Sequence, residues 1–164
     1  MTRKAVLLVF PLLVCLAACG NVQDTTINVT YDPCQPLAVH VADEATKSQR
    51  DGVAQALTMW NDEAGTQLTL DEAAADDVVD LRFEASFEAF HGVYLDETGE
   101  VVVNDDLTGR PQAITVAHEL GHAFGLVHVD PKIRASVMNA GNLDVAPNAG
   151  DARDVREDWP GCGR

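Results

Sequence analysis

The apolar pattern in the first third of the chain predicts one strand followed by one long helix. Residues 25–31 alternate β-branched and polar side chains, which is typical of a β-strand. Residues 43–64 carry apolar side chains three and four positions apart, with Val53 and Trp60 among them, and this spacing predicts an amphipathic helix. Gly65 is expected to end the helix, and Trp60 is expected to lie in the core.

Four short runs in the middle of the chain predict further strands. Residues 67–70 form a short run, and residues 78–83 form a stronger one. Residues 93–95 and 101–103 are two more strand candidates, and the turn-like sequence at 96–99 joins them. The middle of the chain is therefore predicted to be mainly β-structure.

Two helices and a long loop are predicted in the last third of the chain. Residues 111–124 predict a central helix, and Pro111 suits its first turn, where a missing N–H costs nothing. Residues 129–149 are rich in Pro, Gly and Asn and are expected to form a loop. Residues 151–159 predict a closing helix, with Asp151 in its N-terminal half, where the helix dipole favours acidic side chains.

The length and the net charge of the chain limit the classes of protein to which it can belong. The chain has 164 residues, which is enough for one domain with a real core and too few for two domains of ordinary size. Its 26 acidic residues outnumber its 11 basic residues, so the formal net charge is −15. So acidic a surface argues against binding to nucleic acid or direct adsorption to anionic lipid. A solvated, self-repelling surface explains the charge most simply, and affinity for cationic peptides or Ca²⁺ is the alternative.

The N-terminus is typical of an exported protein. A cationic lead at residues 2–4 precedes an apolar run over residues 5–18, which is interrupted by Pro11 and is too short for a comfortable membrane span. Residues 16–19 resemble the bacterial lipobox, in which a cysteine, here Cys19, becomes the lipidated first residue of the mature protein. An ordinary signal peptide with a coincidental cysteine is the alternative. The chain is thus divided into a signal peptide, a lipidated linker and one domain, at residues 1–18, 19–24 and 25–164.

The four cysteines fit this division. Cys15 would leave with the signal peptide and Cys19 would carry the lipid, so that Cys34 and Cys162 remain. Two thiols in an exported protein suggest a disulfide. The chain-entropy model gives so long a cross-linked loop about 4–5 kcal/mol of stabilisation.

One stretch carries the most informative spacing in the chain. His118 and His122 are four positions apart, so on a helix their imidazoles share one face and converge on one point. Glu119 projects beside that point, where a carboxylate can take a proton from a metal-bound water. Gly125 lets the chain leave the helix with a positive φ, after which His128 can return as a third nitrogen ligand. Three neutral imidazoles leave the fourth tetrahedral position of Zn²⁺ open, which is typical of a catalytic site.

Residues 118–128 read His-Glu-Leu-Gly-His-Ala-Phe-Gly-Leu-Val-His, and this run resembles the extended zinc-binding motif of the metzincin metalloendopeptidases. Gly121 and Leu126 make it most similar to the matrixin branch. That family carries a methionine turn beneath the metal, and Met138, ten residues after His128, fits it. The resemblance implies an α+β fold, that of a metzincin-like catalytic domain. Such a domain has a twisted mixed sheet of about four to five strands, a long N-terminal helix, an active-site helix and a C-terminal helix.

The chain departs from other metzincin branches at two positions. Serralysins and astacins can ligate zinc with a tyrosine two residues after the methionine, whereas Ala140 stands there, so no fifth protein ligand is expected. Adamalysins have an aspartate directly after the third histidine, whereas Val129 precedes Asp130 here. The residues around Cys34 do not match the matrixin cysteine switch, so a disulfide is favoured over a role for that thiol as a cap on the zinc.

The resemblance also implies where a substrate and a second metal would bind. In metzincins the sheet edge above the cleft pairs with the extended substrate, and the corresponding residues here are Val93, Tyr94 and Leu95. An unpaired edge can bind peptide backbone regardless of side chain. Many matrixins bind calcium, for which Asp105 and Asp106 are candidates, although acidic residues in a turn more commonly face solvent.

These observations predict a lipid-anchored zinc endopeptidase of the bacterial cell envelope, on its periplasmic side or at the cell surface. Zinc-bound water would attack the peptide bond with Glu119 as the proton acceptor, and Met138 would form an apolar floor beneath the metal. The expected partners are a peptide or protein substrate and, through the lipid on Cys19, a membrane. No nucleic acid partner is expected, and the protein is expected to be a monomer.

Two other classes of function stay open. A non-catalytic, zinc-stabilised envelope lipoprotein that binds peptides would keep the metal without hydrolysis, although such a site has no need for Glu119. A structural envelope lipoprotein with incidental histidines would contain no metal. Chelator-sensitive turnover separates an enzyme from the first alternative, and the metal stoichiometry tests the second.

Overall fold

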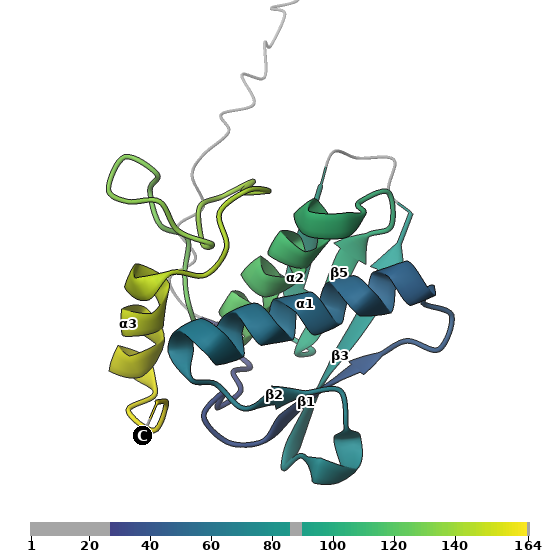
Figure 1. The fold of residues 1–164 in the computed structure, drawn as a ribbon, viewed down its shortest axis with the longest axis horizontal. Helices are drawn as coiled ribbons and strands as arrows, with labels where there is room; N and C mark the ends of the chain where they lie inside the picture. The colour runs from purple at the N-terminus through teal and green to yellow at the C-terminus, as the bar shows by residue number, and fades with distance from the viewer. Residues whose placement is uncertain (1–26, 86–89, 164) are drawn as a thin grey trace, which may run out of the picture.

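The structure is a computed structural model that describes residues 27–85 and 90–163. One five-stranded sheet lies at the centre of this part of the chain (Figure 1). Its strands are β1 (Leu37–Val41), β2 (Leu68–Thr69), β3 (Asp77–Glu84), β4 (Gly92–Leu95) and β5 (Glu100–Asn104). They are ordered β2-β1-β3-β5-β4, and every neighbouring pair is parallel except β4 with β5. The sheet is therefore mixed, and β4 forms one of its edges.

In the described part of the chain, three α-helices accompany the sheet. They are α1 (Lys47–Ala64), α2 (Gly109–Ala123) and α3 (Ala149–Asp158), and a short 3₁₀ helix, η1 (Glu72–Ala74), precedes β3. Figure 1 shows α1 running across the strands with α2 packed against it, and α3 at one side near the C-terminus. The predicted α+β fold with a mixed sheet is confirmed. No helix within the described ranges is both long and apolar enough to cross a membrane.

The predicted first strand is wrong over its described part, residues 27–31, which form irregular chain. One main-chain N–H of this segment donates to the carbonyl of Asp96 and another to that of Ala123, so its bonds go to two separate elements and not to one partner strand. The first strand is instead β1, which the pattern analysis missed. Four of its five side chains are buried, and a strand covered on both faces does not show the polar alternation of a half-buried one.

The other predicted elements are present, and their ends are set by local caps. The four later strands correspond to β2 to β5, and the central helix corresponds to α2. The long helix begins later than predicted because Thr46 and Gln49 form a capping box, and it ends at Gly65, whose φ is 73°. The closing helix begins earlier than predicted because Asn148 and Asp151 form a second capping box.

The core fixes α2 in place through the two tryptophans. Trp60 is fully buried, as predicted, and its indole N–H donates to the carbonyl of Ala117 at 2.8 Å. The same ring packs edge-on against Phe124 at a centroid distance of 5.4 Å. The indole N–H of Trp159 donates to the carbonyl of Phe124 at 2.8 Å. Both α1 and the end of α3 therefore hold the helix that carries the histidines.

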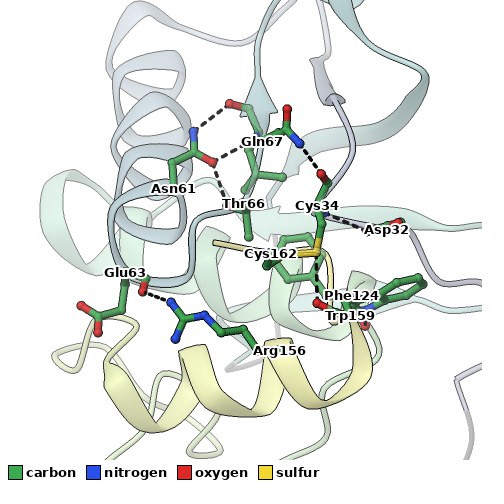
Figure 2. Close-up of a disulfide and its surroundings, with 11 residues drawn as sticks. Asp32, Cys34, Asn61, Glu63, Thr66, Gln67, Phe124, Arg156, Trp159 and Cys162 are labelled. Atoms are coloured by element: carbon green, nitrogen blue, oxygen red, sulfur yellow. Dashed lines mark hydrogen bonds between the residues drawn. A yellow bond between two sulfur atoms is a disulfide. The ribbon is translucent and has the colours of Figure 1, made fainter. Parts of the chain in front are cut away.

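Figure 2 shows the disulfide between Cys34 and Cys162, which ties the chain before β1 to the turn after α3. The bonded residues are 128 positions apart, and the predicted pairing is confirmed. Cys34 is therefore not available as a cap on a metal. The predicted signal peptide and the lipidated Cys19 fall on residues 1–26, outside the described part of the chain.

Candidate metal centre

Three imidazoles converge beside the C-terminal half of α2. The Nε2 atom of His128 lies 3.2 Å from Nε2 of His118 and 3.2 Å from Nε2 of His122, and one ligand nitrogen from each ring lies within 4.8 Å of the others. Tetrahedral coordination with Zn–N bonds of about 2.0–2.1 Å places neighbouring nitrogens roughly 3.3–3.4 Å apart. The three side chains therefore fit a metal ion of this size and can hold one.

The end of α2 turns the chain so that the third histidine can return. Gly125 adopts φ 96°, and its N–H donates to the carbonyl of His122 at 2.9 Å. The next N–H, of Leu126, donates to the carbonyl of Gly121 at 2.9 Å, which completes a Schellman motif. The N–H of Val129 then donates to the carbonyl of Met138, so the residue after the third histidine is fixed to the loop beneath the site.

Main-chain carbonyls set the tautomers of the two helical histidines. Nδ1 of His118 lies 2.7 Å from the carbonyl oxygen of Val137, and Nδ1 of His122 lies 2.8 Å from that of Leu126. A carbonyl can only accept, so both Nδ1 atoms carry the proton and both Nε2 atoms present a lone pair to the metal position. Burial, reinforced by the neighbouring imidazoles, lowers the pKa of each of these rings to about 4. Both rings are therefore neutral at pH 7 and able to coordinate.

Glu119 lies in the same cleft, between α2 and β4. Its carboxyl group is buried and packs directly against Gly92, the first residue of β4. Burial raises the pKa of this carboxyl to about 8, against a smaller opposing effect of a main-chain hydrogen bond at Tyr94. A dication held by the neighbouring imidazoles would lower that pKa, because it favours the ionised form. The predicted acid is thus next to the metal position and shielded from bulk water.

Met138 lies under the turn of α2 that carries both histidines. It is buried, and a side chain on Gly121 would collide with its sulfur. Met138 therefore packs against the helical turn that lies between the two histidines. Gly121 leaves the space that the methionine fills, a role that the residue spacing alone did not indicate.

Asp151 organises the loop that carries Met138, and sequence analysis missed this role. Its fully buried carboxylate accepts hydrogen bonds from the guanidinium of Arg134 at 2.7 Å, from the hydroxyl of Ser136 and from the N–H of Val137 at 3.1 Å. The carbonyl of Val137 in turn accepts from His118. Since the partners lie 14 to 17 positions upstream in an aperiodic loop, no sequence signal marks the contact.

A cleft of about 400 Å³ opens over the histidines, and β4 forms one wall. Of the predicted substrate-binding residues, Val93 and Tyr94 line this cleft, whereas Leu95 does not. Val93 is 40% exposed on the edge strand, and the hydroxyl of Tyr94 donates to the carbonyl of Val29 at 2.9 Å. Gly92, which was not predicted, also lines the cleft.

The two acidic residues suggested for calcium lie at the surface. Asp105 and Asp106 are exposed in the turn after β5. In the described part of the chain, the three histidines are the only group of three or more side chains close enough to share one metal ion. The calcium site therefore has no further support.

No known protein-family model matches the sequence, and no curated protein matches it. The resemblance to the metzincins accordingly rests on residues 118–128, on Met138 and on the geometry described above.

Proposed function

We propose that the chain is a zinc-dependent endopeptidase of the metzincin type, similar to the matrixin branch. The observation that carries the proposal is the convergence of three imidazoles beside a buried carboxyl group at the base of a cleft. The motif at residues 118–128 and the buried Met138 beneath it support the same assignment.

The donor set favours zinc over calcium and magnesium. Imidazole nitrogen is a common zinc ligand, whereas calcium and magnesium require oxygen. Three protein ligands leave one tetrahedral position for water or substrate, as in catalytic zinc sites. When bound, a zinc ion supplies Lewis-acid activation of water and of the scissile carbonyl.

Glu119 and the edge strand supply the chain's own part of the chemistry. Glu119 accepts a proton from the attacking water and returns it to the leaving amine, a role that suits a carboxyl group buried in the same cleft as the three imidazoles. The exposed edge of β4 presents main-chain N–H and C=O groups to an extended peptide. This mode of binding accepts many sequences, as an endopeptidase requires.

The proposal includes export and attachment to the cell envelope through a lipid on Cys19. The disulfide between Cys34 and Cys162 supports export, because such bonds persist in oxidising compartments. The acidic net charge of −15 makes direct electrostatic adsorption to anionic lipid unfavourable, so a covalent lipid is the more suitable tether.

Metal analysis and cleavage of an unfolded protein test the proposed function. The chain without its first 19 residues should contain about one zinc per molecule and should cleave the substrate until a chelator removes the metal. Glu119→Ala should retain zinc and lose activity by roughly 10²–10⁴-fold, whereas Glu97→Ala, in the exposed turn after β4, should behave as the parent. Peptide binding without cleavage would support the non-catalytic alternative, and unchanged cleavage by Glu119→Ala would refute the mechanism.

A further inference from the structure

The backbone conformation at Gly92 does not require a glycine. It begins β4 and pairs with Val103 of β5 in the antiparallel ladder. Its φ does not lie in the positive region, unlike that of Gly99 in the following turn. Any residue could adopt this conformation, so the reason for a glycine must lie in the surrounding space.

The space beside Gly92 is filled by side chains of α2. A Cβ atom at this position would lie 2.8 Å from Oε1 and 2.9 Å from Cγ of Glu119. It would also lie 2.8 Å from Cγ2 of Thr115, one helical turn earlier. Real Cβ atoms do not approach other atoms this closely, so even the smallest side chain would force one of these groups to move.

We propose that Gly92 is a positioning residue for Glu119. Its bare main chain forms the wall against which the carboxyl group rests, and this contact holds the acid in the cleft beside the three imidazoles. The inference rests on the proposed function, because it assigns Gly92 a purpose in placing the group that handles the proton. Gly92 has no side chain that could bind a metal or transfer a proton, so its effect acts through Glu119.

The contacts around Gly92 indicate which group would yield to a side chain. Strand β4 pairs with β5 along its whole length, and Tyr94 fastens it to Val29. Thr115 is β-branched, stiff at χ1 and buried on α2. The carboxyl end of Glu119 is held by a main-chain hydrogen bond at Tyr94, but it is the far end of a longer and unbranched side chain, so it is the group that an added methyl would displace.

The first test is the kinetic effect of Gly92→Ala in the exported protein loaded with zinc. A displacement of about 1 Å at a reacting group can cost about 100-fold in rate, so kcat should fall by that order with KM and zinc content unchanged. Gly52→Ala is the matched control, because it also adds a methyl against a buried side chain of α2, Gln112, but outside the cleft. This control should keep the parental kcat. An unchanged kcat in Gly92→Ala, or a loss of zinc or a raised KM that accounts for the defect, would overturn the proposal.

A second test needs no turnover. Gly92→Ala should lower Tm by about 3–10 °C through overpacking, and the loss should shrink in a Glu119→Ala background, where one of the two colliding side chains is gone. An equal loss of Tm in both backgrounds would show that the contact with Glu119 is not the source, and would overturn the inference. The dependence of this Tm loss on Glu119 does not require catalysis. A protein that shows the smaller loss in the Glu119→Ala background but cleaves no substrate would therefore refute the proposed function and not the contact between Gly92 and Glu119.

Discussion

Replacing Asp151 by asparagine perturbs the site without touching any metal ligand. The side chain keeps its size, but one carboxylate oxygen becomes an NH₂ group that cannot accept a hydrogen bond. In the native protein, Oδ1 accepts from Arg134 and Ser136, and Oδ2 accepts from the N–H groups of Val137 and Asn148, each at 3.1 Å. Whichever oxygen is replaced, two donors lose their acceptor.

The burial of these groups sets the magnitude of the loss. The side chain of Asp151 is 0% exposed, and the N–H of Val137 is also in the interior. A buried donor left unpaired costs about 1–3 kcal/mol, and two donors lose their acceptor here, whereas the guanidinium of Arg134 keeps Asp154 as a partner. We therefore expect Asp151→Asn to lower the free energy of unfolding by about 2–6 kcal/mol, a large part of the 5–15 kcal/mol typical of a domain.

The same substitution should weaken metal binding. The N–H of Val137 is held by Asp151, and the carbonyl of Val137 accepts from Nδ1 of His118. Loss of an outer partner of a ligating histidine typically costs about 10–100-fold in metal affinity. Competition with a chromophoric chelator measures this affinity, and urea unfolding of the metal-free protein measures the stability.

Asp154→Asn is the matched control. Asp154 bonds to the same guanidinium, of Arg134, from the same helix, but its side chain is 33% exposed. Exposed ion pairs contribute about 0–1 kcal/mol, so this variant should stay within that range and keep its metal affinity. Equal losses in the two variants, or a loss below about 1 kcal/mol in Asp151→Asn, would refute the argument from burial.

Two further predictions concern pH and the disulfide. The pH prediction is made for metal-free Glu119→Gln, because this substitution removes the titration of the acid, whose effect on stability opposes that of the histidines. Burial lowers the pKa values of His118 and His122 to about 4 in the folded protein, whereas the unfolded values are about 6.5. The unfolded chain therefore binds more protons than the folded protein between about pH 4 and about pH 6.5. The free energy of unfolding should fall by on the order of 3 kcal/mol per histidine as pH falls from about 6.5 to about 4. A free energy of unfolding in urea that does not change over this pH range would contradict this. Replacing Cys34 and Cys162 by serine should cost up to about 5 kcal/mol for a loop spanning 128 positions, and an unchanged urea midpoint would contradict the loop-entropy argument.

The sequence alone determined those features that arise from neighbours along the chain. The four-residue spacing of His118 and His122 places both rings on one helical face because of helix geometry, and Gly125 marks the turn that follows because few other residues accept its φ. The long helix was predictable from its apolar spacing, and the cysteine pairing followed from elimination. The helix and turn features depend on residues that are close in sequence, and only one pair of cysteines was left to form a disulfide.

Only the tertiary structure decided which distant surfaces meet. Strand β1 escaped prediction because layers contributed by distant parts of the chain bury both of its faces and remove the alternation. Asp151 reads as an ordinary acid at a helix start, and Gly92 reads as an ordinary glycine before a strand. The role of Asp151 depends on the turn at Val137, and the role of Gly92 depends on the carboxyl group of Glu119, and only the packing of the fold brings these groups together. Such contacts have no period along the chain, because they depend on how the elements pack in three dimensions.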